Sequence, residues 1–472
     1  MAKNYTFMFK YPPMSVVLKN LQIKNFKGFQ REQSIAFEKL TILTGENSSG
    51  KSSVIHAILG LIQSGEYPYK FSPNGKYINM GDFKEISNKH KANEITLGLT
   101  FYHKNLKKEL RFKTIWKNSK ANYLPTLKFL EFGAEFFLLS VRNIKNKYFL
   151  DFSYDPLKDP EYSPEKEKLQ KEDLLRSFVS VRGKSSNKKQ FEKEFLKEKR
   201  YISTMYKKAN IKNIEIKDID NLYEEVRSKM NMNLHYTIDG IMDRIPGEYD
   251  KNINAISSFR LHPERTYLVQ SKDELKIGKF GEGYLDQIIL WEKIKHPKFK
   301  ELNSIMKRLR LTHSISAHHM EGGRFEVLVT PKQGGIKSSL IDVGFGISQF
   351  LPIIIADLQL KNDSTLFVAE PEIHLHPSVQ AEFGDYLVEQ IDKKGKNYII
   401  ETHSEYFLNR IRLAIVNGTL KEKDLAVYYF DNDGNDIITY KLKFGKKGEI
   451  EGAPDNFFKT YMMDVMDIAL TV

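Results

Sequence analysis

Residues 45–52 contain a glycine, four intervening residues, and then Gly50, Lys51 and Ser52. This is the spacing of a loop that binds the phosphates of a nucleotide. Its backbone N–H groups approach phosphate oxygens, Lys51 pairs with the β- and γ-phosphates, and the Ser52 hydroxyl contacts Mg²⁺. The sequence therefore predicts ATP and Mg²⁺ as cofactors, with Ser52 on the metal side. The predicted nucleotide-binding residues of this loop are Gly45, Glu46, Asn47, Ser48, Ser49, Gly50, Lys51, Ser52 and Ser53.

Two residues suited to acid–base chemistry end apolar runs further along the chain. The run "TLFVAE" ends at Glu370, and a carboxylate there can orient water for attack on a γ-phosphate. The run "YIIETH" ends at His403, whose ring can donate a hydrogen bond to that phosphate. Because ligands gather at the carboxyl ends of strands in α/β sheets, we predict that Glu370 and His403 are catalytic. The alternatives are a solvated acid in a loop and a structural histidine.

A glycine-rich turn, "DVGFGISQ", opens an apolar stretch at residues 342–360. Helix N-termini and serine hydroxyls bind phosphate well, so Gly346, Ser348 and Gln349 are further predicted nucleotide contacts. Taken alone, the turn also fits an ordinary helix entry. A second "GKSS", at residues 183–186, lacks the upstream glycine, which argues against another phosphate loop there.

Apolar periodicity predicts the elements that hold these residues. The phosphate loop is expected between a strand and an amphipathic helix, and Glu370 and His403 at strand ends. Strands are expected at residues 16–23, 34–43, 94–104, 108–117, 325–330, 364–370 and 397–403, helices at 51–64, 346–360 and 405–418, and a hairpin at 424–442.

The composition is that of a globular chain, with 41% hydrophobic residues and no cysteine, which excludes disulfides and thiolate metal sites. The net charge of +13 permits contact with DNA, although the lysines are spread widely and interleaved with glutamate. The N-terminus does not resemble a secretory signal, and no apolar run is long enough to span a membrane. A cytoplasmic protein without membrane contact is therefore expected.

A charged, helix-favouring stretch at about residues 155–235 interrupts the pattern of strands and helices. We interpret it as a helical insertion that divides the chain into three parts. Residues 1–150 would hold the phosphate loop and an antiparallel β-subdomain, residues 151–250 the insertion, and residues 251–472 the remaining site residues.

The order of the four motifs resembles that of the ABC-type ATPase superfamily: phosphate loop, signature, strand-end glutamate and switch histidine. Within it, the chain is similar to the RecF/OLD-like group of bacterial ATPases through "VGFGISQ", "EPEIHLHP" and, less specifically, "SSFRLHPERTYL" at 257–268. The resemblance covers roughly residues 16–120 and 255–472. It implies an α/β fold, an ABC-type P-loop ATPase head with a mixed sheet flanked by helices, an antiparallel β-subdomain and the helical insertion.

The resemblance also implies that two heads dimerise head to tail and trap ATP between the phosphate loop of one and Ser348 of the other. The family carries an acid before the catalytic glutamate to support Mg²⁺, but Ala369 stands at that position. Either Glu372 or Asp82 would compensate, or hydrolysis would be slow. The histidines of "HLHP" invite a metal hypothesis, but no third ligand is evident in the sequence.

Three hypotheses for the role follow. The size, the insertion and the lone head resemble the ATPase subunits of two-gene anti-phage systems, first Septu, with an HNH nuclease partner, and next PARIS, with a Toprim nuclease partner. The chain would then be an ATP-binding, slowly hydrolysing sensor and scaffold for a separate nuclease subunit, without a nuclease domain of its own. The alternatives are a DNA-repair or chromosome-maintenance ATPase that clamps DNA, and a nucleotide-binding module without turnover.

Overall fold

A computed structural model describes most of the chain, which forms two compact units. The first unit comprises residues 1–26, 60–75 and 79–251, and the second comprises residues 27–59, 76–78 and 252–472. The residues described are 15–65, 67–119, 124–160, 163–165, 168, 172, 196, 208–217, 244–268, 276–454 and 457.

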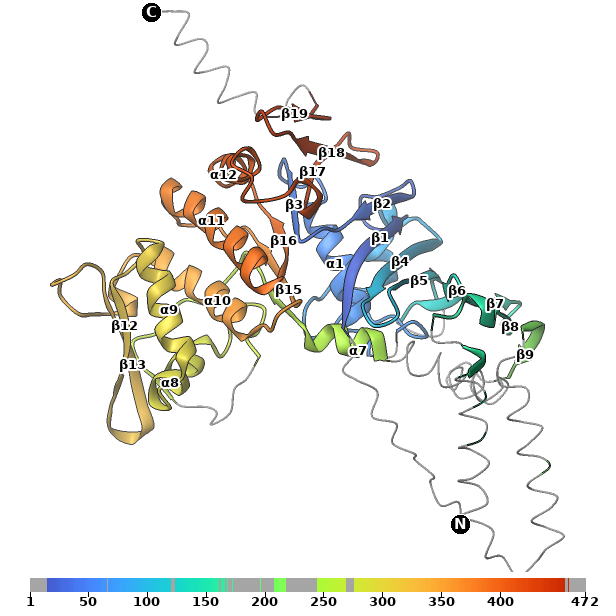
Figure 1. The fold of residues 1–472 in the computed structure, drawn as a ribbon, viewed down its shortest axis with the longest axis horizontal. Helices are drawn as coiled ribbons and strands as arrows, with labels where there is room; N and C mark the ends of the chain where they lie inside the picture. Colours follow the sequence, from blue (N-terminus) through green and yellow to red (C-terminus); the bar gives the residue numbers. More distant parts are fainter. Residues whose placement is uncertain are drawn as a thin grey trace, which may run out of the picture. The chain divides into compact units, whose positions relative to one another are not determined.

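The first unit is built on antiparallel strands in the order β1-β4-β5-β6-β7-β8-β9 (Figure 1). Its strands alternate buried and less buried residues, as expected for a sheet with one face on a core. Its elements are β1 (Val16–Lys24), α2 (Phe83–Ile86), η1 (Asn88–His90), β4 (Glu94–His103), β5 (Lys108–Lys117), β6 (Thr126–Ala134), β7 (Phe137–Ile144), β8 (Lys147–Tyr154), η2 (Pro156–Lys158), β9 (Ala209–Ile216) and α7 (Arg244–Lys251).

The second unit contains a seven-stranded mixed sheet in the order β10-β15-β16-β3-β17-β18-β19 and a smaller sheet of β11 to β14. Its strands are β2 (Gln33–Ala36), β3 (Leu40–Gly45), β10 (Ile253–Ile256), β11 (Tyr267–Leu268), β12 (Ser314–His319), β13 (Arg324–Thr330), β14 (Ser338–Ser339), β15 (Thr365–Ala369), β16 (Asn397–Glu401), β17 (Leu425–Asn432), β18 (Ile437–Phe444) and β19 (Ile450–Glu451). Its helices are α1 (Lys51–Ile62), whose last turn is assigned to the first unit, α8 (Tyr284–Lys293), α9 (Pro297–Arg308), η3 (Glu321–Gly323), η4 (Leu340–Asp342), α10 (Phe345–Gln359), α11 (Pro377–Lys394), α12 (Glu405–Val416) and η5 (Glu422–Asp424).

Five neighbouring strands of the mixed sheet, β10, β15, β16, β3 and β17, pair in parallel. Every residue of β3 is buried, and so is every residue of β16, as expected for central parallel strands covered on both faces. In register, Ala369 of β15 lies beside Glu401 of β16, and Glu401 lies beside Leu43 of β3. The carboxyl ends of these three strands therefore meet at one edge.

Local signals explain where the helices that follow these strands begin and end. Helix α11 starts with Pro377 after His376, whose ring accepts a hydrogen bond from the backbone of Ser378, and it stops at Gly395 in the left-handed conformation. Helix α12 starts after Ser404, whose hydroxyl accepts from the N–H of Phe407 at 3.0 Å. The Ser404 cap sets the point at which the chain leaves β16 and enters α12.

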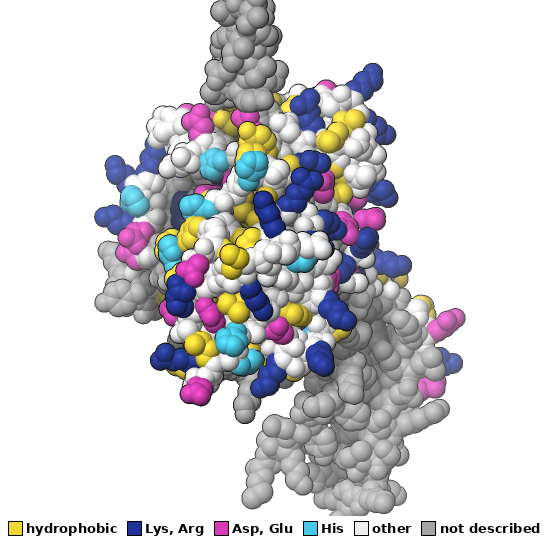
Figure 2. Space-filling model, turned by 90° about the vertical axis from the view of Figure 1, so that its left-hand side faces the viewer, with side chains coloured by type: hydrophobic (Ala, Val, Ile, Leu, Met, Phe, Trp, Pro, Cys, Tyr) yellow, Lys and Arg dark blue, Asp and Glu magenta, His cyan; other side chains and the backbone are white. Residues whose placement is uncertain are grey.

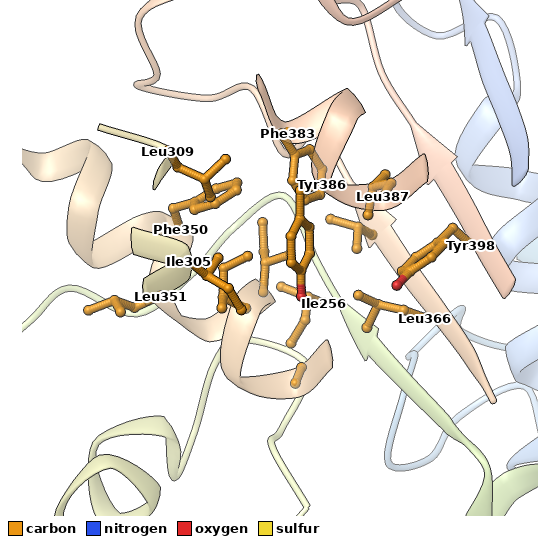
Figure 3. Close-up of a cluster of buried hydrophobic side chains, with 14 of the residues drawn as sticks. Ile256, Ile305, Leu309, Phe350, Leu351, Leu366, Phe383, Tyr386, Leu387 and Tyr398 are labelled. Atoms are coloured by element: carbon orange, nitrogen blue, oxygen red, sulfur yellow. The ribbon is translucent and has the colours of Figure 1, made fainter. Parts of the chain in front are cut away.

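The core of the second unit lies between helices α9, α10 and α11 and strands β10, β15 and β16. Figure 3 shows Phe350 of α10, Phe383 and Tyr386 of α11, and Leu366 and Tyr398 of the strands gathered in one buried cluster. Helix α10 is buried along almost its entire length, so it is apolar on nearly all sides rather than amphipathic.

One charge pair is embedded in this core. Lys396 and Asp357 are both 1% exposed, and their Nζ and Oδ2 atoms lie 2.9 Å apart. The hydroxyl of Tyr398 donates to Asp357 Oδ1 at 2.9 Å, and the hydroxyl of Tyr386 donates to Oδ2. The network ties α10, α11 and β16 together, and its charges are tolerated because each has several partners.

Most expected elements of the two units are confirmed, including the strands at 108–117 and 364–370, the helix at 346–360 and the hairpin at 424–442. The short helix α2 was not among the expected elements, and Asp82 caps it. The expected helical insertion falls mainly on residues outside those described; the described part includes strand β9, which pairs with β8. None of the helices that the structure describes is both long and apolar enough to cross a membrane.

We expect that Lys396→Met lowers the free energy of unfolding by about 3–5 kcal/mol, because it leaves the carboxylate of Asp357 buried without its cation. Urea denaturation followed by circular dichroism measures the change. Lys393→Met is the matched control, because Lys393 forms an exposed pair with Glu389 and should change stability by about 0.5 kcal/mol or less. Equal shifts for the two variants would contradict a stabilising role for the buried pair.

Candidate functional site

The phosphate loop lies between β3 and α1, as the sequence predicts. Gly45 ends β3 with φ 139°, and a Cβ atom at this position would lie 2.2 Å from the carbonyl oxygen of Phe430 in β17. Only glycine fits there, because the backbone of β17 passes so close. The amide of Asn432 donates to the carbonyl of Ser48 at 3.2 Å and holds the tip of the loop.

Lys51 is buried within its own loop. It is 4% exposed, and its Nζ donates to the carbonyls of Gly45 at 3.1 Å and Glu46 at 2.6 Å. Burial lowers its pKa, while the nearby carboxylates Glu401, Glu370 and Glu372 act in the opposite direction. The ammonium group is therefore held at the centre of the loop by carbonyls and surrounded by acids.

The loop also contains an unpaired buried hydroxyl. Ser49 is 1% exposed, and its Oγ has no hydrogen-bond partner. Buried polar atoms are almost always paired, so an unpaired hydroxyl beside a lysine and a helix N-terminus suits a phosphate oxygen. The donors present, which are hydroxyl, ammonium and backbone N–H groups, fit a nucleotide phosphate.

Ser52 contacts a carboxylate that the sequence analysis did not identify. Its Oγ donates to Glu401 Oε1 at 2.6 Å, and Glu401 is 4% exposed. Burial raises the pKa of Glu401, and the hydrogen bond from Ser52 and the charge of Lys51 oppose that rise. The hydroxyl and the carboxylate are both hard oxygen ligands of the type that Mg²⁺ prefers.

Glu370 follows β15 in an unusual backbone conformation. Its φ is 47°, in the left-handed region, which costs about 1–2 kcal/mol for a residue other than glycine. Its N–H donates to the carbonyl of Glu401 at 2.7 Å. Arg260 Nη2 donates to the carbonyls of Ala369 at 2.7 Å and Glu370 at 3.0 Å. These bonds hold the strained turn that positions the Glu370 side chain.

Arg260 is itself fully enclosed. It is 2% exposed, and burial lowers its pKa to about 10, while Glu372 and Glu370 oppose the decrease. The guanidinium therefore keeps its charge at neutral pH. Its Nε and Nη1 atoms are buried and have no hydrogen-bond partner, so Nη2 alone makes its two bonds to the turn.

His403 is exposed and lies two residues after the end of β16, and its backbone N–H donates to Glu372 Oε1. Burial lowers the pKa of the imidazole, Lys51 lowers it further and Glu370 opposes the shift. A neutral ring at neutral pH keeps one N–H group to donate. The structure thus brings Lys51, Glu370 and His403 into one electrostatic neighbourhood.

The predicted contacts Gly346, Ser348 and Gln349 lie at the start of α10. The hydroxyl of Ser348 donates to the carbonyl of Phe345 at 2.8 Å, and the amide of Gln349 to the carbonyl of Leu261 at 3.3 Å. Ser348 is 1% exposed. The side chains of Ser348 and Gln349 thus bond to their own surroundings and not to the phosphate loop, so their contact with nucleotide stays a prediction.

Close packing connects this helix start to the segment after β15. The centroid of the Phe345 ring lies 4.6 Å from the centroid of the His262 ring and 4.8 Å from that of the His374 ring. A Cβ atom at Gly346 would lie 2.5 Å from the carbonyl oxygen of His374. Glycine at position 346 is thus required for this approach.

The structure gives other roles to several residues that the sequence left open. His376 caps α11 and His374 packs on Phe345, which accounts for the histidine pair without a metal. Among the residues described, no group of three His, Cys, Asp or Glu is arranged to hold a metal ion. Asp82 accepts from the N–H of Glu85 at 3.0 Å as a helix cap within the first unit, and Glu372 accepts from the backbone N–H of His403 within the second.

Glu401 and Arg260 are the functional candidates that sequence reasoning missed. Glu401 lies inside the run "YIIETH", which was expected to be a buried strand, where a charged residue is unusual. Arg260 lies in "SSFRLHPERTYL", which resembled the ATPase group, but its partners are far away in sequence. The available signal for Glu401 was therefore an acidic residue in a buried strand. No signal in the sequence identified the contact that Arg260 makes.

Comparison with known proteins yields a family match over most of the chain. The family described as "AAA ATPase domain" matches residues 17–408. A curated "ATP/GTP phosphatase" from Helicobacter pylori is 27% identical over 105 residues, which are 22% of this chain and 26% of that protein. The match thus spans about a quarter of the relative's length.

Two solved structures also resemble the chain. One is the Smc head domain with an extended coiled coil, bound to the C-terminal domain of ScpA, derived from Pyrococcus furiosus; its TM-score is 0.40 at 12% identity, over 96% of this chain and 100% of that one. The other is the SMC head domain from Thermotoga maritima, with a TM-score of 0.38 at 11% identity, over 89% and 97% of the two chains.

The expected fold class is confirmed. The second unit has a mixed sheet with the phosphate loop at the end of β3, the first unit an antiparallel sheet, and the family match covers both. This is the α/β fold of an ABC-type P-loop ATPase.

We expect Arg260→Met to reduce kcat for ATP about 10- to 100-fold, because the turn that holds Glu370 loses both hydrogen bonds from Arg260. Nucleotide affinity should change little, since both bonds go to the Glu370 turn and not to the phosphate loop. Steady-state phosphate release and nucleotide titration measure the two quantities. Arg310→Gln is the control, because the Arg310 side chain is 77% exposed and pairs with Glu382 rather than with the Glu370 turn. An unchanged kcat in Arg260→Met would show that the turn does not need this support.

Proposed function

Because this chain belongs to the AAA ATPase domain family, we propose that it binds ATP with Mg²⁺ and hydrolyses the terminal phosphate. The observation that carries this proposal is the convergence, at the carboxyl ends of β3, β15 and β16, of Lys51, Ser52, Glu370 and His403. Ligands of α/β sheets bind at this edge.

The residues present fit both cofactors. The loop N–H groups, the Ser49 hydroxyl and Lys51 would hold the phosphates, and Ser52 with its partner Glu401 would face the metal. Bound Mg²⁺ supplies positive charge that stabilises negative charge on the phosphate oxygens.

Glu370 would orient and polarise the attacking water, since its carboxylate is close enough to Lys51 to raise the pKa of that ammonium group. His403 would donate a hydrogen bond from its neutral ring to the terminal phosphate. Arg260 acts on Glu370 only through the backbone, so it positions the base rather than taking part in the reaction.

We further propose that two heads act together, head to tail, with Ser348 of one facing the phosphate loop of the other. The resemblance of the motifs to those of ABC-type ATPases supports this arrangement. Within one chain, Ser348 and Gln349 bond to Phe345 and Leu261 rather than to that chain's own phosphate loop. Phe259 and Leu261, on either side of Arg260, are 66% and 43% exposed, and a partner surface would cover them.

The biological role is proposed from the resemblance of the motifs. The leading proposal is a slow ATPase that serves as sensor and scaffold for a separate HNH or Toprim nuclease subunit in anti-phage defence. Slow turnover is expected because Ala369 stands where the resemblance implies an acid that supports Mg²⁺.

The alternative is an ATPase that clamps DNA, which the net charge of +13 favours. On the face in Figure 2, Lys and Arg side chains are scattered among acidic ones rather than gathered in one patch, which weakens this alternative for that face.

Purified protein should release phosphate from ATP in the presence of Mg²⁺. We expect Lys51→Ala to weaken ATP binding about 10- to 100-fold, because a charged contact to phosphate is lost. Glu370→Gln should slow turnover about 10²- to 10⁴-fold while it keeps nucleotide affinity. Wild-type turnover in Glu370→Gln would show that another residue is the base.

Two measurements separate the roles. If the chain is a nuclease scaffold, co-expression with the product of the adjacent gene should yield a complex that survives gel filtration. If it clamps DNA, DNA should stimulate turnover, and the stimulation should fall steeply between about 50 and 200 mM salt. Absence of a complex together with DNA stimulation would reverse the order of the two proposals.

A further inference from the structure

Position 369, where the resemblance implies an acid, holds an alanine, and the neighbouring strand holds Glu401 beside it. Ala369 is the last residue of β15 and pairs in parallel register with Glu401, the last residue of β16. Residues in register on parallel strands point to the same face of the sheet. A carboxylate absent from one strand is therefore present on its neighbour, on the same face.

Strand order favours the neighbour as the source of the acid. In the sheet, where the strand order is β15-β16-β3, strand β16 is adjacent to the strand that carries the phosphate loop. Neighbouring strands lie about 4.8 Å apart, so position 401 is one spacing from β3 and position 369 is about 10 Å away. A glutamate at 401 reaches the loop serine directly, as the 2.6 Å bond to Ser52 shows.

We infer that Glu401 is the carboxylate that supports Mg²⁺ beside Ser52, in the place of the acid that Ala369 cannot supply. This inference rests on the proposed function, because it assigns the metal side of the same ATP site. Ser52 is exposed, so its hydroxyl is accessible to a ligand, while Glu401 is buried behind it. One carboxylate together with a hydroxyl and substrate phosphates is a typical set of partners for Mg²⁺.

The other acids nearby are occupied differently. Glu370 leaves the strand in a left-handed turn, and Glu372 Oε1 accepts the backbone N–H of His403. Neither is recorded in contact with Ser52, whereas Glu401 is bonded to it. The competing explanation is structural: a buried acid close to the N-terminus of α1 would stabilise that helix without binding metal.

The test measures metal binding rather than turnover. Mn²⁺ replaces Mg²⁺ as the probe, and electron paramagnetic resonance reports the free Mn²⁺ in the presence of protein and a non-hydrolysable ATP analogue. We expect Glu401→Gln, which keeps the shape and a hydrogen bond to Ser52, to weaken Mn²⁺ binding about 10- to 100-fold. Its affinity for the analogue without metal should remain that of the wild type.

The neighbouring position supplies the rescue. The double variant Ala369→Asp/Glu401→Gln returns the acid to β15 and should recover at least part of the lost Mn²⁺ affinity, which a misfolded protein cannot do. Glu372→Gln is the matched control and should leave Mn²⁺ affinity within about twofold, because Gln keeps an oxygen for the N–H of His403.

The outcomes distinguish the two levels of the proposal. If wild-type protein binds the analogue with Mn²⁺ and Glu401→Gln binds Mn²⁺ equally well, the assignment of Glu401 is overturned and the proposed ATP site stands. If wild-type protein does not bind the analogue at all, the proposed function fails, and the assignment fails with it. Loss of Mn²⁺ affinity in Glu372→Gln but not in Glu401→Gln would transfer the role to Glu372.

Discussion

The parallel register of β15, β16 and β3 is the constraint on which the site depends. It places Ala369, Glu401 and Leu43 side by side, so that the segments leaving the three strands share one edge of the sheet. The phosphate loop, the turn at Glu370 and the turn at His403 all begin there. The strands are buried on both faces, so the packing of their apolar side chains holds this alignment together with the hydrogen bonds between the strands.

Backbone conformation places the proposed catalytic groups within this edge. Gly45 turns away from β3 beneath the carbonyl of Phe430, and Glu370 adopts a left-handed conformation that Arg260 and Glu401 hold through its carbonyl and N–H groups. A strained backbone conformation of this kind persists only where several surrounding contacts hold it in place. Arg260 is enclosed with two unpaired nitrogens, so the turn is held at a cost in desolvation.

The buried Asp357–Lys396 pair connects the core to the site. Asp357 belongs to α10, which begins with the predicted signature residues, and Lys396 immediately precedes β16, which ends at Glu401. Tyr386 brings α11 into the same network. A displacement of α10 relative to β16 would leave charged groups unpaired in the core, so the two site-bearing elements are expected to move as one body.

The sequence alone determined the local features: the phosphate-loop spacing, the strand before it and the helix after it, and the two strands that end within two residues of Glu370 and His403. These are signals of neighbouring residues and of short periodicity, which a linear pattern records. Only the tertiary structure decided which strand lies next to which, and hence that Glu401 contacts Ser52. It also decided that Arg260 reaches Glu370 across 110 positions of the chain. Such contacts depend on strand order and packing, because distance along the chain does not determine distance across a sheet.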